Sequence, residues 1–361
     1  MTTGLKVSTL STPLAELHRA SGARVGEWFG CALPSDFGDW RREYEFARHN
    51  VALIDKNYRA YLAFAGPDRI RYLNAILTNN IKDLREGEGV VSLLLNPQGR
   101  IQAEIETYAE AERLFSVSFA MIREKLIEAL DRYIIMDDVT LADESARFGT
   151  LALEGPAATA VVKELTGVEL VALPELGFRD ATVASIPCRV VRRSPSGVSG
   201  AEFLCQQSDL AALWGELRKA ASAHGGGPMG CTALNALRLE SGIPWFGYDF
   251  GEKQIPHEAA LENSHISYTK GCYTGQEIVE RVRSRGQVNR VRALFKLTAP
   301  ELPSPDTPIL FEGKDVGFTT RAAHSPAFQS NIAMGYIRRE QSAAGTALLI
   351  AGAPAVAILP S

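Results

Sequence analysis

The sequence predicts an α+β protein of three domains, and three observations lead to that fold class. The chain has 361 residues, which is more than one hydrophobic core usually supports. Helical and strand-like patterns occur throughout the first 300 residues without the regular βαβ alternation of a parallel sheet. Beyond residue 300 the patterns are short apolar strands with no long helix, which is typical of a small β-barrel. We therefore expect α+β domains over 1–148 and 149–299 and a β-barrel over 300–361.

Hydrophobic periodicity locates the elements of the first domain. Ile70, Leu73 and Leu77 fall on one face of a helix over 68–77, whereas apolar and polar residues alternate over 101–108 as in a half-buried strand. The expected helices span 14–20, 40–49, 68–77 and 122–134, and the expected strands span 60–64, 90–95, 101–108 and 115–119. The order of strands and helices from residue 60 onwards fits a ferredoxin-like unit.

The same reasoning places the elements of the other two domains. Pro156 begins a helix that Gly167 ends, and Ser208 precedes a helix that carries Leu213 and Trp214. The glycines at 225–227 form a loop or linker, because they lack the spacing of a phosphate-binding fingerprint. The expected strands span 151–154, 183–185, 189–193, 202–206, 309–311, 316–320, 333–337, 347–350 and 355–359.

Composition restricts the function classes. The net charge of -4 exerts no general attraction toward nucleic acid or membranes, and no apolar run approaches the roughly 18 residues that span a bilayer. Residues 1–13 lack the pattern of a secretory signal and are interpreted as a loose arm. The five cysteines are odd in number and have no CxxC spacing. Reduced thiols in a cytoplasmic protein are therefore expected, with neither a disulfide framework nor a metal site.

The octapeptide at 270–277, KGCYTGQE, is the most informative segment. Thr274 and Glu277 have the spacing of a capping box at the start of a helix. Cys272 would then lie just outside a helix N-terminus, where the macrodipole and the charge of Lys270 favour a thiolate. Cys272 and Lys270 are therefore the candidate catalytic residues. The alternative is an inert cysteine beside a tight turn.

This octapeptide resembles the hallmark of the YgfZ-type folate-binding proteins, a branch of the glycine-cleavage T-protein (aminomethyltransferase) superfamily. Further similarity follows in the expected order over most of the chain, from about residue 14 to the C-terminus. The segments that carry it are ILTNNI at 76–81, LLNPQGR at 94–100, ALRLESGIP at 236–244 and PHEA at 256–259.

The resemblance implies a ring of three domains with tetrahydrofolate, or another reduced folate, in the central hole. Glu202 matches the carboxylate that holds the pterin, and Arg238 matches an arginine of the folate site. Asn79 and Glu104, in the folate-binding N-terminal domain, complete the expected cofactor-binding residues. The alternatives are a strand-face carboxylate for Glu202 and a solvated charge for Arg238.

The chain departs from the transferases where their acid pair lies. Ala103 stands at the first acidic position and Glu104 at the second, and Phe246 replaces the tyrosine of the Y-G-x-E step. Because a group that moves protons must be held very accurately, loss of the aspartate puts T-protein catalysis in doubt.

Three functions remain open from the sequence. The leading one, implied by the resemblance, is a cytoplasmic tetrahydrofolate-binding accessory protein for iron–sulfur cluster assembly or repair, linked to tRNA modification. Its partners would be iron–sulfur assembly or client proteins. The alternative is a folate-dependent one-carbon (aminomethyl or methyl) transferase, and the third is a pure interaction protein.

The arginines after the octapeptide bear on possible anionic partners. They would form an anion surface for a polyglutamate tail, RNA phosphate or an acidic protein, or else a solvated helix end; they are Arg281, Arg283, Arg285, Arg290 and Arg292.

Overall fold

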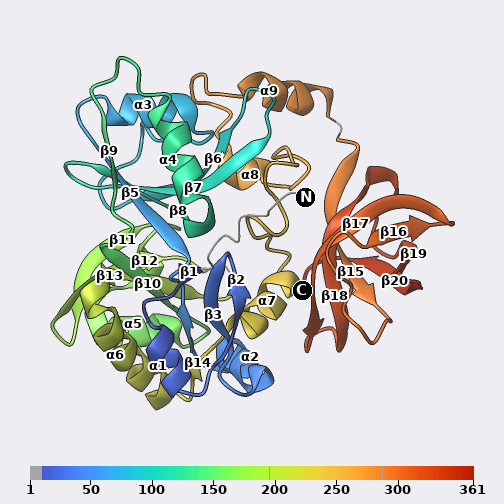
Figure 1. The fold of residues 1–361 in the computed structure, drawn as a ribbon, viewed down its shortest axis with the longest axis horizontal. Coiled ribbons are helices and arrows are strands. Elements are labelled where there is room, and N and C mark those ends of the chain that lie inside the picture. The colour runs from blue at the N-terminus through green and yellow to red at the C-terminus, as the bar shows by residue number, and fades with distance from the viewer. Residues whose placement is uncertain (1–9, 195, 287) are drawn as a thin grey trace, which may run out of the picture.

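Three lobes surround the middle of the molecule in this computed structural model, which describes residues 10–194, 196–286 and 288–361 (Figure 1). Most of the arm expected at 1–13 lies outside the described residues. Two lobes combine sheets with helices, and the third is a closed β-barrel. The predicted α+β class with a C-terminal barrel is confirmed.

The first lobe is a five-stranded sheet in the order β6-β7-β8-β5-β9. Its apolar face packs against α3 (Arg69–Ile76) and α4 (Arg123–Asp131), and Leu62, Leu73 and Leu126 are buried between them. The strands are β5 (Arg59–Ala65), β6 (Gly89–Leu95), β7 (Ile101–Ala109), β8 (Leu114–Phe119) and β9 (Thr140–Asp143).

The second lobe is a six-stranded sheet in the order β11-β12-β13-β10-β4-β14. Helices α5 (Ala158–Thr166) and α6 (Leu210–Ala223) cover one face of it and bury Trp214 and Phe203. The strands are β4 (Ala52–Asp55), β10 (Phe148–Glu154), β11 (Phe178–Val183), β12 (Ile186–Arg192), β13 (Gly200–Gln206) and β14 (Gly227–Pro228).

The expected linear boundary at residue 148 needs correction, because β4 belongs to the second sheet. It pairs antiparallel with β10 and parallel with β14. The glycines at 225–227 lead directly into β14, and a Cβ at Gly226 would lie only 1.8 Å from the carbonyl oxygen of Val51. This close backbone approach explains the glycine there better than a flexible linker does.

The N-terminal segment adds a small sheet in the order β1-β3-β2. Helix α2 (Trp40–His49) spans the residues that periodicity predicts, and the Asp39 carboxylate caps it by accepting the N–H of Arg41 at 3.0 Å. The remaining elements here are β1 (Leu10–Ser11), α1 (Ala15–Ala20), β2 (Arg24–Trp28) and β3 (Cys31–Asp36).

Helix α7 (Cys231–Glu240) is buried along its length except at Thr232, and it connects the two α+β lobes to the barrel. It contacts β3, α2 and β17. Two further helices, α8 (Glu262–His265) and α9 (Gln276–Arg285), follow before the barrel begins.

The barrel closes in the order β15-β18-β17-β16-β19-β20. It begins at residue 290, ten residues before the expected boundary, because β15 pairs with both β18 and β20. Its strands are β15 (Arg290–Leu297), β16 (Pro308–Phe311), β17 (Lys314–Ser325), β18 (Ser330–Arg338), β19 (Ala347–Ile350) and β20 (Ala353–Ile358).

Candidate functional site

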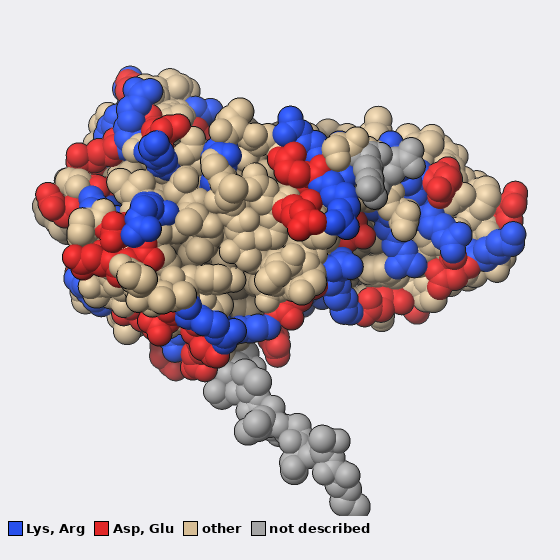
Figure 2. Space-filling view, turned by 90° about the horizontal axis from the view of Figure 1, so that it is seen from above, with Lys and Arg blue, Asp and Glu red and all other residues tan. Residues whose placement is uncertain are grey.

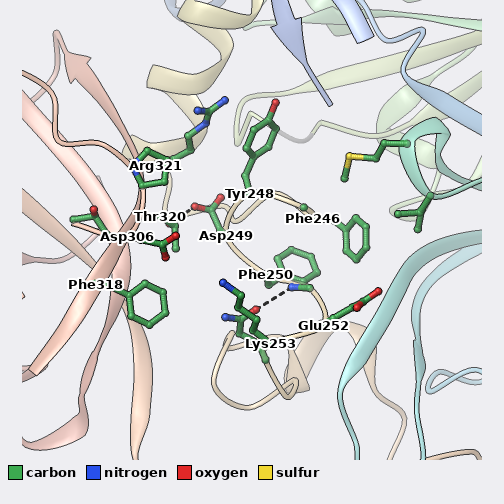
Figure 3. Close-up of a pocket in the computed structure, with 17 residues that line it drawn as sticks. Phe246, Tyr248, Asp249, Phe250, Glu252, Lys253, Asp306, Phe318, Thr320 and Arg321 are labelled. Atoms are coloured by element: carbon green, nitrogen blue, oxygen red, sulfur yellow. Dashed lines mark hydrogen bonds between the residues drawn. The ribbon is translucent and has the colours of Figure 1, made fainter. Parts of the chain in front are cut away.

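A pocket of about 580 Å³ lies where the first lobe, the loop after α7 and the barrel meet. Met121 lines it from the first lobe, the loop at 246–254 forms its floor, and Phe318 to Arg321 line it from β17. Figure 3 shows the rings of Phe246, Phe250 and Phe318 around its middle, with Arg321 and Tyr248 at one end and Lys253 at the other. We call this the central pocket.

Arg321 supplies a positive charge to this pocket. Its guanidinium lies 4.1 Å from the ring centroid of Tyr248 and 5.3 Å from that of Trp28. Among the described residues it forms no ion pair with a carboxylate, and its Nε is buried without an acceptor. A cation held by aromatic faces and not neutralised by an acid is suited to an anionic ligand group.

Arg238 does not line the central pocket but lies behind its wall. Its side chain is fully buried and donates to the Asp249 carboxylate and, at 2.9 Å, to Asn235 Oδ1. Asp249 does line the pocket and also accepts from the hydroxyl of Thr320. Burial lowers the pKa of Arg238, and the Asp249 charge acts in the opposite direction. Arg238 therefore positions Asp249 and is not a solvated charge.

Glu202 lies in a buried charge network between the two α+β lobes. Its Oε1 is 3.2 Å from Lys56 Nζ and accepts from Arg59 Nη2 at 3.1 Å. Arg59 also contacts Glu106, which pairs with Arg193 at 2.9 Å. We refer to these residues, together with Glu154, as the inter-lobe charge network.

The electrostatics of the inter-lobe charge network follow from its burial. Burial alone would raise the pKa of Glu106, but the charges of Arg59 and Arg193 lower it to about 2. Burial raises the pKa of Glu154, because only Lys56, at 3.9 Å, lies close enough to oppose the effect. Lys56 Nζ and Glu154 Oε1 are buried without hydrogen-bond partners. The network therefore retains unsatisfied polar groups at the pterin position implied by the resemblance.

A series of aromatic contacts connects this network to the central pocket. The Arg59 guanidinium lies 5.6 Å from the ring of Phe119, and Phe119 is 5.2 Å from Phe246 in the pocket wall. Phe29 and Tyr58 stack beside them at 4.1 Å. Glu202 is thus separated from the central pocket by one guanidinium and two aromatic rings.

The two other expected folate ligands also make contacts within the protein. Glu104 Oε1 lies 3.0 Å from His265 Nε2, which joins β7 to the end of α8. Asn79 Nδ2 donates to the carbonyl of Val91 at 2.9 Å and to that of Ser264 at 3.2 Å. Neither residue lines the central pocket.

The octapeptide at 270–277 differs from its predicted local structure. Helix α9 begins after Gly275, which adopts a left-handed conformation with φ of 81°, and no side chain caps it. Thr274 and Glu277 therefore form no capping box, and Glu277 instead pairs with Arg281. The backbone reaches the helix through a glycine turn, which replaces the side-chain cap.

Lys270 is occupied by a different helix. Its Nζ donates to the backbone carbonyls of Asn74, Leu77 and, at 3.1 Å, Asn79, at the C-terminal end of α3. Burial lowers the pKa of Lys270 to about 8. This ammonium satisfies carbonyls that the helix end leaves free, so its immediate role is to hold the loop against α3.

Cys272 is the exposed member of the five cysteines. The other four are buried, and burial raises the pKa of Cys188 to about 11 and that of Cys205 to about 12. No group of three metal-ligating side chains occurs within the residues described.

The arginines after the octapeptide do not form one surface. Arg281 and Arg283 pair with acids of their own helix, whereas Arg292 is partly buried and donates to the carbonyls of Ala259 and Gly242. The Arg285 side chain lies outside the described atoms. Figure 2 shows charges of both signs interspersed around an uncharged central area. None of the helices described is long and apolar enough to cross a membrane.

Sequence reasoning missed Lys56, Arg59, Glu106 and Arg193 as members of the central network. A signal was available, because Glu106 lies inside the apolar strand β7 and Arg59 begins the apolar strand β5. Charged residues inside apolar strands are rarely left unpaired when buried. Which charges would pair could not be read from local sequence.

Comparison with known proteins agrees with this architecture. The GCVT N-terminal domain model matches residues 14–265, and the glycine cleavage T-protein C-terminal barrel domain model matches 290–353. An aminomethyltransferase of Streptomyces avermitilis is 27% identical over 93% of this chain and 91% of its own length. One from Rubrobacter xylanophilus is 29% identical, with 91% and 87% covered.

A solved structure shares the whole fold. The glycine cleavage system aminomethyltransferase T from Bartonella henselae superposes with a TM-score of 0.86 and 22% identity over 97% of both chains. The two domain models together span both α+β lobes and the barrel. The chain therefore belongs to the glycine-cleavage T-protein (GcvT) family.

Proposed function

We propose that this protein binds a reduced folate in the central pocket and takes part in folate-dependent one-carbon transfer. Full-length relatives named aminomethyltransferase support this proposal. The structural observation that carries it is an aromatic pocket of about 580 Å³ with an unneutralised guanidinium, Arg321, at one end. That volume is in the range of small-molecule sites.

The chemistry of a folate fits this pocket. Its flat rings can stack on Phe246, Phe250 and Phe318, and its glutamate carboxylates can pair with Arg321 and Lys253. Under this proposal, Arg238 acts through Asp249 and does not touch the ligand.

Titration of the purified protein with tetrahydrofolate by calorimetry tests the binding step. Arg321→Gln should weaken binding by about 10- to 100-fold, because a charge-assisted hydrogen bond contributes roughly 1.5–3 kcal/mol. Lys314→Gln removes an exposed charge from the same strand, outside the pocket, and is the matched control. Unchanged affinity in Arg321→Gln would reject this pocket as the site of the carboxylate tail.

Transfer chemistry needs a polar group beside the reacting carbon. Ala103 is 1% exposed in the core of the first lobe, so no carboxylate arises from that position. The neighbouring acid, Glu104, is paired with His265. We therefore expect little or no transfer from an aminomethyl-lipoyl carrier, and a different one-carbon donor or acceptor. Formation of methylenetetrahydrofolate at about 1 per second or faster would instead establish ordinary T-protein activity.

A second candidate function is accessory: service to iron–sulfur cluster assembly or repair, linked to tRNA modification. The observation that favours it is the exposed Cys272 on the loop that Lys270 holds against α3. In cells lacking this protein, Cys272→Ser should bind folate normally but fail to restore cluster-dependent methylthiolation of tRNA. Full restoration by Cys272→Ser would remove this candidate.

A further inference from the structure

A second pocket lies in the second lobe, outside the ring of lobes around the central pocket. Its volume is about 440 Å³, and it is formed by one face of α6 together with the end of α1 and the segment after β3. From α6 it is lined by Trp214, Gly215, Arg218, Lys219 and Ser222. We call it the α6 pocket.

The charge of the α6 pocket is positive. Arg218 and Lys219 line it, and neither forms an ion pair within the described residues. No aspartate or glutamate is among the described residues that line it. Most other arginines of the second lobe, such as Arg189 and Arg193, have carboxylate partners. This pair of cations is thus left without an internal anion.

Trp214 provides an independent observation that points to a ligand. Its indole is 1% exposed, and its Nε1–H has no hydrogen-bond acceptor within the part of the chain described. The faces beside it are occupied by the rings of His18 at 4.8 Å and Phe37 at 6.1 Å. An unpaired buried donor is costly, and an acceptor entering the pocket would satisfy it.

Gly215 is the third observation. It lies in the interior of α6, where glycine costs roughly 1 kcal/mol relative to alanine. A Cβ at this position would meet no heavy atom within 4 Å, so packing does not require the glycine. Its backbone φ is not in the left-handed region either. The missing side chain instead keeps the floor of the pocket open.

We propose that the α6 pocket is a binding site for a small organic oxyanion, a metabolite that bears a phosphate or carboxylate group. Arg218 and Lys219 provide the charge complement, and the Trp214 indole donates to the anion. The volume exceeds that of a bare ion, which favours an anion with an organic body. The site is independent of folate in the central pocket.

Inorganic pyrophosphate and citrate are suitable probes for the two anion types, with glycerol as the uncharged reference. Each is titrated into ¹⁵N-labelled protein while the indole N–H resonances are recorded; the chain has four tryptophans, and Trp214→Phe assigns the relevant peak. We expect the Trp214 indole resonance to shift with a Kd below about 1 mM for at least one probe. Binding should weaken with added salt, because the cations are solvent-accessible. The tighter probe identifies phosphate or carboxylate as the recognised group.

Two variants and one control make the result specific. Arg218→Gln with Lys219→Gln should weaken binding at least about tenfold. Gly215→Met should remove binding without lowering Tm, because methionine fills the open floor and favours the helix. Lys82→Gln with Lys314→Gln makes the same charge change elsewhere and should leave Kd unaltered. No indole shift at about 10 mM probe, or wild-type affinity in either pocket variant, would overturn the proposal.

Discussion

The two buried charge groups beside the central pocket are built in different ways. The inter-lobe charge network draws Lys56, Arg59 and Arg193 together with Glu106, Glu154 and Glu202. On the barrel side a single pair, Arg238–Asp249, is reinforced by the hydroxyl of Thr320. A network of several charges can redistribute its contacts when one member is lost, whereas a lone pair leaves one uncompensated charge. The difference predicts that the simple pair is the more vulnerable of the two.

The largest effect is expected at the barrel side. Arg238→Ala should lower the free energy of unfolding by about 3–5 kcal/mol, because it leaves the Asp249 carboxylate buried without its cation. Urea unfolding measures the change, and Arg85→Ala, whose side chain is 86% exposed, is the control. If Arg238→Ala weakens folate binding but leaves stability unchanged, Arg238 is a ligand-binding residue after all.

Acid should act on the inter-lobe charge network through Glu106. Its pKa is about 2 in the folded protein and about 4.3 in an unfolded chain, so the unfolded state binds more protons between these values. The stabilisation, on the order of 3 kcal/mol, is present above about pH 4.5 and is lost as the pH falls toward 2. Unfolding curves from pH 7 to pH 2.5 should therefore be flatter for Glu106→Gln than for the wild type. Equal slopes would show that the network is not anchored by this carboxylate.

A smaller loss is expected at Glu202. In Glu202→Gln the amide oxygen can still accept from Arg59, and Glu106 and Glu154 still compensate part of the positive charge. We expect a loss of about 2–3 kcal/mol in unfolding free energy. Asp180→Asn, at a side chain 70% exposed, provides the comparison in the same sheet. A loss larger than that of Arg238→Ala would reverse the proposed ranking of network and pair.

The smallest effect concerns reactivity alone. Iodoacetamide at neutral pH should modify Cys272 first, because the other four thiols are buried and burial raises their pKa values. Peptide mass mapping over time measures the order, and the unfolding free energy should not change. Earlier modification of Cys188 or Cys205 would show that the second lobe opens more readily than its packing indicates.

Local sequence patterns predicted much of the fold. Helix α2 and strand β19 occupy the ranges that periodicity indicates, and β6, β7 and β8 agree to within one residue at each end. The small sheet of β1, β2 and β3 was missed, because its strands are short and β2 is largely exposed. The capping box at Thr274 was wrong, because a left-handed glycine made the turn without it.

The candidate site was less predictable than the fold. Lys270 and Arg238 were identified as important residues, but their partners lie at distant positions in the chain or behind a wall. The central pocket combines Met121, the loop after α7 and strand β17, and no local motif announces that combination. Arg321 was not identified, because a single arginine within a strand gives no sign of an unneutralised charge.

The sequence by itself determined the α+β class, the C-terminal barrel and the positions of most helices and strands. Hydrophobic periodicity carries that information, because it reports which side of each element is buried. Only the tertiary structure decided that β4 joins the second sheet, that Lys270 closes the end of α3 and that Arg238 binds Asp249. These outcomes depend on which polar groups are brought together when distant segments pack. A buried charge must find a partner, and the local sequence does not specify which one.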